Sequence, residues 1–197
     1  GDAVFSLREA YVGWQGEGGW GVDAGRLTLR DGPAYGYNPT DFFRGDALRT
    51  ITTANPFSLR ENRLGSVMLR VQRLGGGGAW SLALSPKLRD PGRSTAGGSA
   101  DLGATNGRDR VLLSYARRFG EAVNGQLLLH KAAGDDAVIG ANGSWLAGDA
   151  LVVHGEWTHG RERPLLAQAL AQPSAAQRRQ RAALGLTYTT PTRASLT

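Results

Sequence analysis

The sequence contains no cysteine, and its positive charge comes almost wholly from arginine, because lysine occurs only at positions 87 and 131. The absence of cysteine excludes a disulfide scaffold and thiolate metal sites, and it suits a chain that crosses an oxidising compartment. Long hydrophobic runs are also missing, since no stretch approaches the ~20 apolar residues of a transmembrane helix. Disulfide-stabilised domains are therefore excluded, and no transmembrane helix is predicted within these residues.

Motifs that carry chemistry are equally scarce. The three histidines form no recognisable triad with serine and aspartate, and the glycine run at 75–78 is interpreted as a hairpin turn because no helix follows it to cradle a phosphate. His154 and Glu156 share one face of a predicted strand, but a metal site needs at least a third ligand. The sequence predicts no enzyme, no catalytic residues, no metal and no cofactor.

Glycine, in contrast, is abundant, with 29 residues in 197, about twice the average usage of roughly 7%. An interior glycine costs a helix about 1 kcal/mol. This composition predicts many turns and closely spaced strands.

The net charge of +6 is compatible with nucleic acid, an anionic membrane surface or an anionic solute as partner. The densest basic run is QRRQR at 177–181, between two predicted strands, and it is interpreted as a solvated loop, so no nucleic-acid partner is predicted. The segment 161–180, which ends within this run, has the composition of a short helix.

Nine segments show the period-two pattern of strands and have roughly the length that spans a bilayer when tilted. Val67, Leu69 and Val71, for example, share one face, while Met68 and Arg70 share the other. The nine segments are 5–14, 20–30, 62–73, 79–86, 109–118, 124–131, 137–145, 150–160 and 181–189.

Short and long connections alternate along the chain. The short ones are 15–19, 74–78, 119–123 and 146–149, and the others are 31–61, 87–108, 132–136 and 161–180, of which all but 132–136 are long. Outer-membrane barrels have short periplasmic turns and long extracellular loops. The fold predicted is therefore all-β, an antiparallel up-and-down transmembrane β-barrel in a single domain over 1–197.

Tryptophans support this interpretation, because Trp14, Trp20, Trp80 and Trp145 all lie close to predicted short turns. Tryptophan concentrates at membrane–water interfaces, so these four are predicted to form one interfacial band. The alternative is that they are core aromatics of a soluble barrel.

Four stretches carry a resemblance to a known group: LREAYVGW (7–14), VDAGRLTLRDG (22–32), GYNPTDFF (36–43) and RENRLGSVMLR (60–70). They resemble porin-like outer-membrane barrels of Gram-negative bacteria, including families related to alginate-export and hydrophobic-solute channels. In those families a Gly-Arg pair precedes a loop with an Asn-Pro-x-Asp element, which Gly25-Arg26 and Asn38-Pro39-Thr40-Asp41 match. The resemblance covers less than half the chain and implies an outer-membrane channel.

The chain departs from such barrels in its odd strand count, in its beginning within a strand pattern, and in its lack of a terminal aromatic residue. These departures predict that the 197 residues are part of a larger barrel, with unpaired edges at 5–14 and 181–189.

Charged side chains are predicted to face the lumen, since a charge facing lipid costs about 2–4 kcal/mol at the midplane. A bulge near Gly25 would turn Arg26 and Arg30 inward, and the loop 31–61 would either fold inward to constrict the pore or remain extracellular and closed by its own ion pairs. The predicted pore-lining and constriction residues are Glu9, Arg26, Arg30, Asp41, Arg44, Arg60, Arg70, Gln72, His154 and Glu156.

The function expected is that of a porin-like channel in the bacterial outer membrane that passes hydrophilic, anionic solutes. Its partners would be outer-membrane lipid and such a solute, and a homo-oligomer is allowed. A soluble up-and-down barrel that binds a ligand and a non-channel structural outer-membrane protein remain as alternatives.

Overall fold

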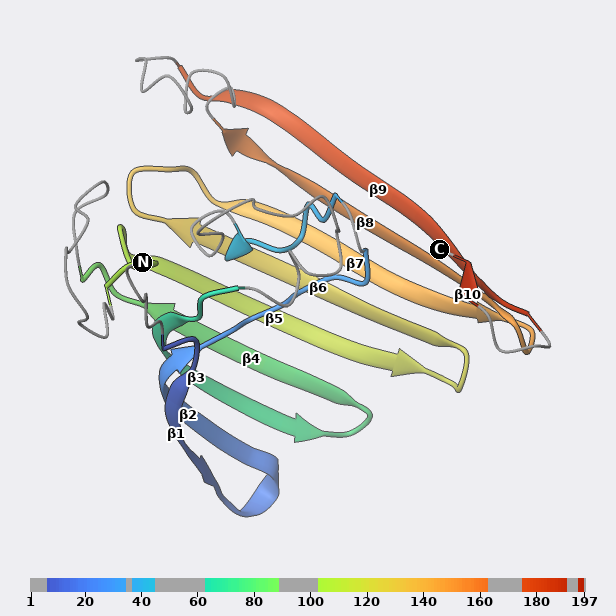
Figure 1. Ribbon diagram of the computed structural model, residues 1–197, viewed down its shortest axis with the longest axis horizontal. Coiled ribbons are helices and arrows are strands. Elements are labelled where there is room, and N and C mark those ends of the chain that lie inside the picture. The colour runs from blue at the N-terminus through green and yellow to red at the C-terminus, as the bar shows by residue number, and fades with distance from the viewer. Residues whose placement is uncertain are drawn as a thin grey trace, which may run out of the picture.

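The described part of the chain forms one ten-stranded antiparallel sheet, in which every strand pairs with its neighbours in the sequence. The computed structural model describes residues 7–34, 37–44, 63–88, 103–162, 175–190 and 195–196. The strands are β1 Ala10–Gln15, β2 Trp20–Leu27, β3 Ser66–Gly75, β4 Gly78–Ser85, β5 Arg110–Phe119, β6 Val123–Ala132, β7 Val138–Ala147, β8 Leu151–Glu162, β9 Gln177–Thr189 and the short β10 Ser195–Leu196 (Figure 1). A 3-10 turn, η1 Glu17–Gly19, joins β1 to β2.

All nine predicted strands are present within a few residues, and the all-β, antiparallel, up-and-down architecture is confirmed. Two strand starts differ most from the prediction. The first strand was predicted to begin at residue 5, but β1 begins at Ala10. Residues 177–181, interpreted as a loop, belong to β9 and pair with β8, for example Arg181 with Thr158. The helix predicted in 161–180 falls mostly on residues outside those described. No helix in the described residues is long and apolar enough to cross a membrane.

Tight turns join the strands at one end of the sheet, and this end is called the turn end below. The β3–β4 hairpin turns at Gly76 and Gly77, whose φ angles are 58° and 78°. Two-residue hairpin turns of this kind require positive φ, which only glycine adopts without strain. The β1–β2, β5–β6 and β7–β8 connections lie at the same end, because successive strands alternate in direction.

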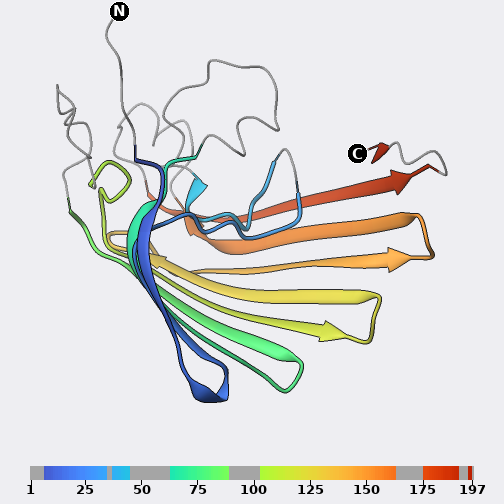
Figure 2. The ribbon, with the colours of Figure 1, turned by 60° about the horizontal axis from the view of Figure 1, so that its bottom comes forward.

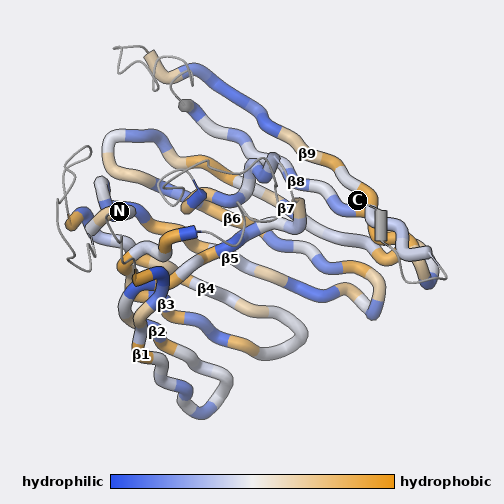
Figure 3. Tube along the Cα trace, viewed as in Figure 1, coloured by the Kyte–Doolittle hydropathy of each residue, from blue (hydrophilic) through white to orange (hydrophobic). Residues whose placement is uncertain are grey.

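The sheet curves into a trough, so that it has a convex and a concave face (Figure 2). The strand register places large apolar side chains in rows on the convex face, as in Val71–Leu82–Leu113–Leu129–Ile139. The large apolar residues that are exposed there are Val12, Trp14, Trp20, Leu69, Trp80, Leu84, Val111, Leu113, Phe119, Val123, Leu127, Leu129, Ile139, Trp145, Trp157, Leu184, Leu186 and Tyr188. Their hydropathy along the strands can be followed in Figure 3.

The concave face carries a small apolar core in addition to polar residues. Met68, Ala83, Leu112 and Leu128 alternate with the convex residues, and each is at most 4% exposed. They pack with Leu27 and with Phe43 from the connection between β2 and β3. The sequence pattern predicted a polar inner face, and this core is the part of that face that the prediction missed.

The sheet is not closed into a barrel. Among the described residues β1 pairs with β2 alone, and no ladder joins β1 to β9 or β10. The other edge is formed by β9, to which only the two residues of β10 are added. Within the described ranges, the outer side of β1 and most of the outer side of β9 therefore have no strand partner.

Candidate functional site on the concave face

The chain after β2 folds into the trough. Residues 28–34 and 37–44, called the inner segment below, run along the concave face and contact β6, β7 and β8 (Figure 2). This part of the predicted loop therefore lies against the concave face of the sheet. The rest of the predicted loop up to residue 62 lies outside the described residues.

A row of three polar side chains receives the inner segment. Gln126 on β6, Asn142 on β7 and Glu156 on β8 are cross-strand neighbours on the concave face. Asn142 Nδ2 donates a hydrogen bond of 3.0 Å to Gln126 Oε1. Directly opposite side chains in antiparallel strands are close enough to interact, so these three, called the polar row below, form a continuous surface across three strands.

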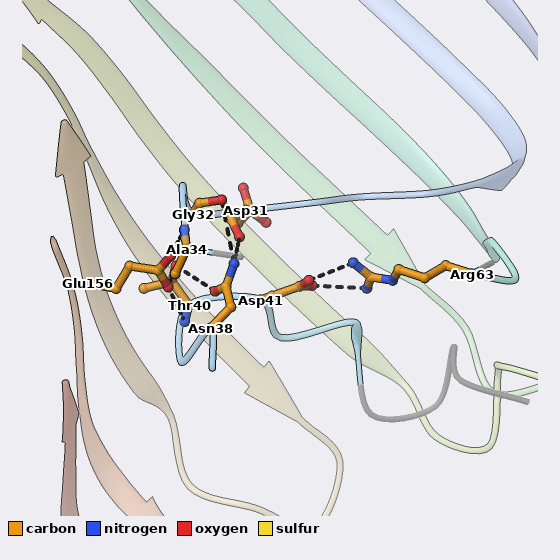
Figure 4. A network of polar contacts seen from close by, with 8 residues as sticks. All are labelled: Asp31, Gly32, Ala34, Asn38, Thr40, Asp41, Arg63 and Glu156. Carbon is orange, nitrogen blue, oxygen red and sulfur yellow. Dashed lines mark hydrogen bonds and ion pairs between the residues drawn. The ribbon is translucent and has the colours of Figure 1, made fainter. Parts of the chain in front are cut away.

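Glu156 is the strongest contact between the wall and the inner segment. Its Oε1 accepts a hydrogen bond from Ala34 N at 2.7 Å, and its Oε2 accepts from Thr40 N at 3.2 Å and from Thr40 Oγ1 at 2.8 Å. Glu156 is 4% exposed and Thr40 is fully buried. A carboxylate buried to this extent must be compensated, and two backbone N–H groups and one hydroxyl supply that compensation (Figure 4).

The two amides of the polar row complete the docking. Asn142 Nδ2 donates to Thr40 Oγ1 at 3.1 Å, and Gln126 Nε2 donates to Asp31 Oδ1 at 3.0 Å. Asn38, in the Asn-Pro element, stabilises the conformation of the inner segment, because its Nδ2 donates a hydrogen bond to the carbonyl of Asp31 at 2.8 Å. The Thr40 hydroxyl thus donates to a carboxylate and accepts from an amide, which leaves it fully satisfied.

Gly32 makes this close approach possible. Its φ is +82°, and a Cβ at this position would lie 2.4 Å from both Glu156 Oε1 and Thr40 Oγ1. Any side chain here would be strained in the backbone and would separate the inner segment from Glu156.

Asp31 is the titratable group of the inner segment. The pKa of its carboxyl is raised from 3.8 to about 6. Burial and the charge of Asp41 raise this pKa, while the hydrogen bond from Gln126 and the charges of Arg70 and Arg63 lower it. A buried acid is costly in its charged form, so Asp31 changes charge in the mildly acidic range.

A buried ion pair fixes the far end of the inner segment. Arg63 Nη1 and Nη2 donate to the two carboxylate oxygens of Asp41 at 2.5 Å and 3.0 Å, and the two side chains are 3% and 7% exposed. The bidentate geometry is the strong form of the arginine–carboxylate pair. It ties the inner segment to the residues just before β3.

Aromatic residues next to Asp41 cover the apolar core. Phe42 stacks on His130 with centroids 4.6 Å apart, and the guanidinium of Arg110 lies 4.4 Å from the centroid of Phe43. Phe43 is only 2% exposed. The inner segment therefore has a polar half over Glu156 and an apolar half over Met68 and Leu112.

Asn106 is a second docking residue, in the connection between β4 and β5. It is fully buried; its Oδ1 accepts from Val67 N at 2.9 Å, and its Nδ2 donates to Val67 O, Ser85 Oγ and Pro86 O. Thr105 adds a bond from its hydroxyl to Gly65 O at 2.8 Å. Sequence reasoning missed Asn106, because an asparagine beside glycine in a long connection looks like turn punctuation.

Four of the predicted lumen residues lie on the concave face of the long strands. Arg70 donates from Nε to Ser81 Oγ at 3.1 Å and is opposite Asp23 across the β2–β3 ladder. Gln72 lies two residues further along, and His154, at 7% exposure, lies two residues from Glu156. Asp41 and Arg44 belong to the inner segment, and Arg60 lies outside the described residues.

The β1–β2 end differs from the prediction. Register is continuous through Gly25, so the predicted bulge is absent, and Leu27, not Arg26, faces the core. Arg26 is 2% exposed and donates to the carbonyl of Leu7 at 2.7 Å, away from the inner segment. Glu9 accepts a hydrogen bond from Thr28 N at 3.1 Å, and Arg30 is exposed.

A cavity of about 590 Å³ lies in the trough beside the inner segment and toward the turn end. Gly32 and Pro33 bound it on one side, and the wall contributes Arg118, Asn124, Gln126, Asn142 and Ser144. Amides, a hydroxyl and one guanidinium can hydrogen-bond a small polar molecule. Arg118 and Asn124 were absent from the predicted set, although the alternation of side chains along β5 and β6 places both on the concave face.

The four tryptophans predicted as a band lie on the convex face near the turn end. Trp14 and Trp20 flank η1, Trp80 follows the β3–β4 turn, and Trp145 precedes the β7–β8 turn. All four are between 44% and 60% exposed. Comparison of the chain with family models, curated proteins and solved structures gave no match, so the porin resemblance depends on the quoted motifs alone.

Proposed function

We propose that this chain forms part of the wall of an outer-membrane β-barrel channel, with the inner segment as its constriction and small hydrophilic, anionic solutes as its cargo. The observation that carries the proposal is the division of the sheet into an exposed apolar convex face and a concave face that binds its own loop. Barrels in lipid have this arrangement, with apolar side chains outward and polar ones inward.

The strand lengths and the size of the apolar surface support the membrane environment. The strands β3, β5, β6 and β7 have ten residues each, which matches the 9–11 residues of a tilted transmembrane strand. A water-soluble binding module rarely exposes a contiguous apolar patch larger than a few hundred Å². The convex face, with exposed leucine, valine or tryptophan on all nine long strands, favours lipid over water.

Acidic groups in the trough are already compensated, and this supports an anionic cargo. Asp41 pairs with Arg63, Glu156 accepts three hydrogen bonds from the inner segment, and burial raises the pKa of Asp31. Arg118 lines the cavity and contacts the backbone carbonyl of Glu121. Guanidinium groups remain charged and bind carboxylate or phosphate in fork geometry.

The experiment has two stages. The complete protein is first refolded in buffer and in detergent micelles, and native strand content only in micelles is expected. Planar-bilayer reversal potentials are then measured under a salt gradient for the wild type, Arg70→Ala and Arg118→Ala. An anion-preferring wild type that shifts toward cation preference in both variants is expected, since a positive lumen concentrates anions.

Arg161→Ala is the matched control, because Arg161 is exposed, lies on the same face of β8 as Trp157 and does not line the cavity. Its reversal potential should remain that of the wild type. Folding in plain buffer would reject the membrane proposal, whereas a wild type that prefers cations would reject only the anionic cargo.

A non-channel outer-membrane protein is the second candidate, because Phe42 and Phe43 fill part of the trough. That candidate predicts micelle-dependent folding without measurable conductance, so the same two stages separate it from the channel.

A further inference from the structure

One arginine lies between two tryptophans on the convex face, near the turn end. Arg73 on β3 is the cross-strand neighbour of Trp20 on β2 and of Trp80 on β4. Its guanidinium carbon is 5.3 Å from the centroid of the Trp20 ring, and its side chain is exposed. Among the described residues no carboxylate forms an ion pair with Arg73, so its positive charge on this apolar face is uncompensated.

A groove of about 360 Å³ opens beside this arginine. Trp20, Arg73 and Trp80 form its end, and Val71, Leu82 and Leu113 form an apolar floor. The floor residues are cross-strand neighbours in a single row, and the next row toward the middle of the sheet is Leu69–Leu84–Val111. Two successive rows of aliphatic side chains therefore extend from the guanidinium of Arg73 toward the middle of the sheet.

We propose that this groove is a binding site for an anionic glycerophospholipid, with the phosphate on Arg73 and an acyl chain along the Val71–Leu82–Leu113 floor. A guanidinium presents a fork of N–H donors that matches phosphate oxygens. Indole rings prefer the depth of lipid headgroups, which places Trp20 and Trp80 beside the phosphate. This inference rests on the proposed membrane location and adds a specific lipid to it.

The position of the groove favours a glycerophospholipid over other occupants. The groove lies at the turn end, and short turns of outer-membrane barrels face the periplasm, where the adjoining leaflet consists of glycerophospholipids. A protein partner would need a much larger complementary surface, on the order of 800 Å² per partner. A groove with one cation and a narrow aliphatic floor fits a single lipid.

The test uses fluorescence of the complete protein in phosphatidylcholine vesicles that contain a minor share of phosphatidylglycerol. Bromine on the acyl chains quenches nearby tryptophan, so brominated phosphatidylglycerol is compared with brominated phosphatidylcholine at equal mole fraction. Stronger quenching by the brominated phosphatidylglycerol is expected, because the lipid is enriched beside Trp20 and Trp80.

Arg73→Gln should reduce this enrichment about fivefold, the factor that corresponds to ~1 kcal/mol per basic residue near an anionic headgroup. Arg73→Lys should retain most of the enrichment, which separates loss of charge from loss of folding. Arg117→Gln is the matched control, because Arg117 is an exposed convex-face arginine that lies over Phe119 and outside the groove.

Equal quenching of the wild type by both lipids would overturn the lipid site and leave the membrane proposal standing. A loss in Arg117→Gln as large as in Arg73→Gln would also overturn it, because the attraction would then be diffuse. Quenching by neither lipid would mean that the chain is outside the bilayer, and both proposals would fail.

Discussion

Thr40 and Glu156 are separated by 116 residues in the chain, yet the Thr40 hydroxyl donates a hydrogen bond of 2.8 Å to Glu156 Oε2 inside the trough. The same carboxylate oxygen accepts from Thr40 N at 3.2 Å. One residue of the inner segment thus saturates one oxygen of a buried acid on the distant strand β8. This contact fixes how far the inner segment projects from the wall.

Replacing Thr40 by valine keeps the shape and removes the hydroxyl. We expect Thr40→Val to lower the free energy of unfolding by about 1–3 kcal/mol, because it removes one of the two acceptors of Asn142 Nδ2 and one of the donors to Glu156. Thr40→Ser retains the hydroxyl and should remain within about 1 kcal/mol of the wild type, since it loses only a methyl group. Thermal unfolding in detergent micelles measures both, and equal stability of the two variants would contradict the docking role.

Glu156→Gln should release the polar half of the inner segment. The amide offers a single acceptor oxygen and places its NH₂ against N–H groups, so at least one backbone donor loses its partner. We expect larger and noisier single-channel conductance together with a lower melting temperature. Glu17→Gln is the control, because Glu17 is an exposed residue of η1 and belongs to neither the polar row nor the inner segment. Matching conductance in the two variants would argue against a constriction.

The Asp41–Arg63 pair should behave as a coupled unit. Asp41→Asn or Arg63→Met alone leaves a buried charge without its partner, which typically costs about 3–5 kcal/mol. The double variant should cost clearly less than the sum of the two single variants, since both charges are then absent. A double-mutant cycle from denaturant unfolding gives the coupling energy, and simple additivity would show that the pair contributes little.

Stability should depend on pH through Asp31. Its folded-state pKa of about 6 lies above the ordinary value of 3.8, so between these values the folded protein holds a proton that the unfolded chain releases. The stabilisation from this proton is complete below pH ~4, falls as pH rises and is lost above pH ~6. Asp31→Asn should therefore gain in melting temperature relative to the wild type as pH rises from 4 to 7.

Asp149→Asn, at an exposed position in the β7–β8 turn, is the control for this pH series. Its difference in melting temperature from the wild type should stay constant over the same range. A constant difference in Asp31→Asn as well would show that Asp31 is not the group responsible.

The strands were predictable because their signal is local. Alternation in β7 and β8 places Ile139 and Trp157 on one face and Asn142 and Glu156 on the other, and the register agrees with it. The inner apolar core was not predictable in this way. The alternation of side chains along each strand predicts that Met68 and Leu112 face inward. Only the long-range packing of Phe43 shows that they are covered.

The sequence predicted only the part of the site that depends on local strand alternation. Glu156 was predicted to face inward from its strand alone, and it lies on the concave face. Its hydrogen bonds to Ala34 and Thr40, in contrast, depend on where a distant loop docks. Gln126 and Asn142 looked like ordinary amides on a polar wall. The order Gln126, Asn142, Glu156 across three strands becomes visible only once the register is known.

Pairing of each strand with its neighbours in the chain has a consequence for the order of assembly. Hairpins such as β3–β4 close short loops and can form early, because contacts between residues near in sequence have a low entropic cost of closure. The inner segment cannot dock until β8 is in place, since Glu156 lies on that strand. Met68, Leu112 and Leu128 lie on β3, β5 and β6, so a partly assembled sheet presents them to water on its inner side until Phe43 covers them.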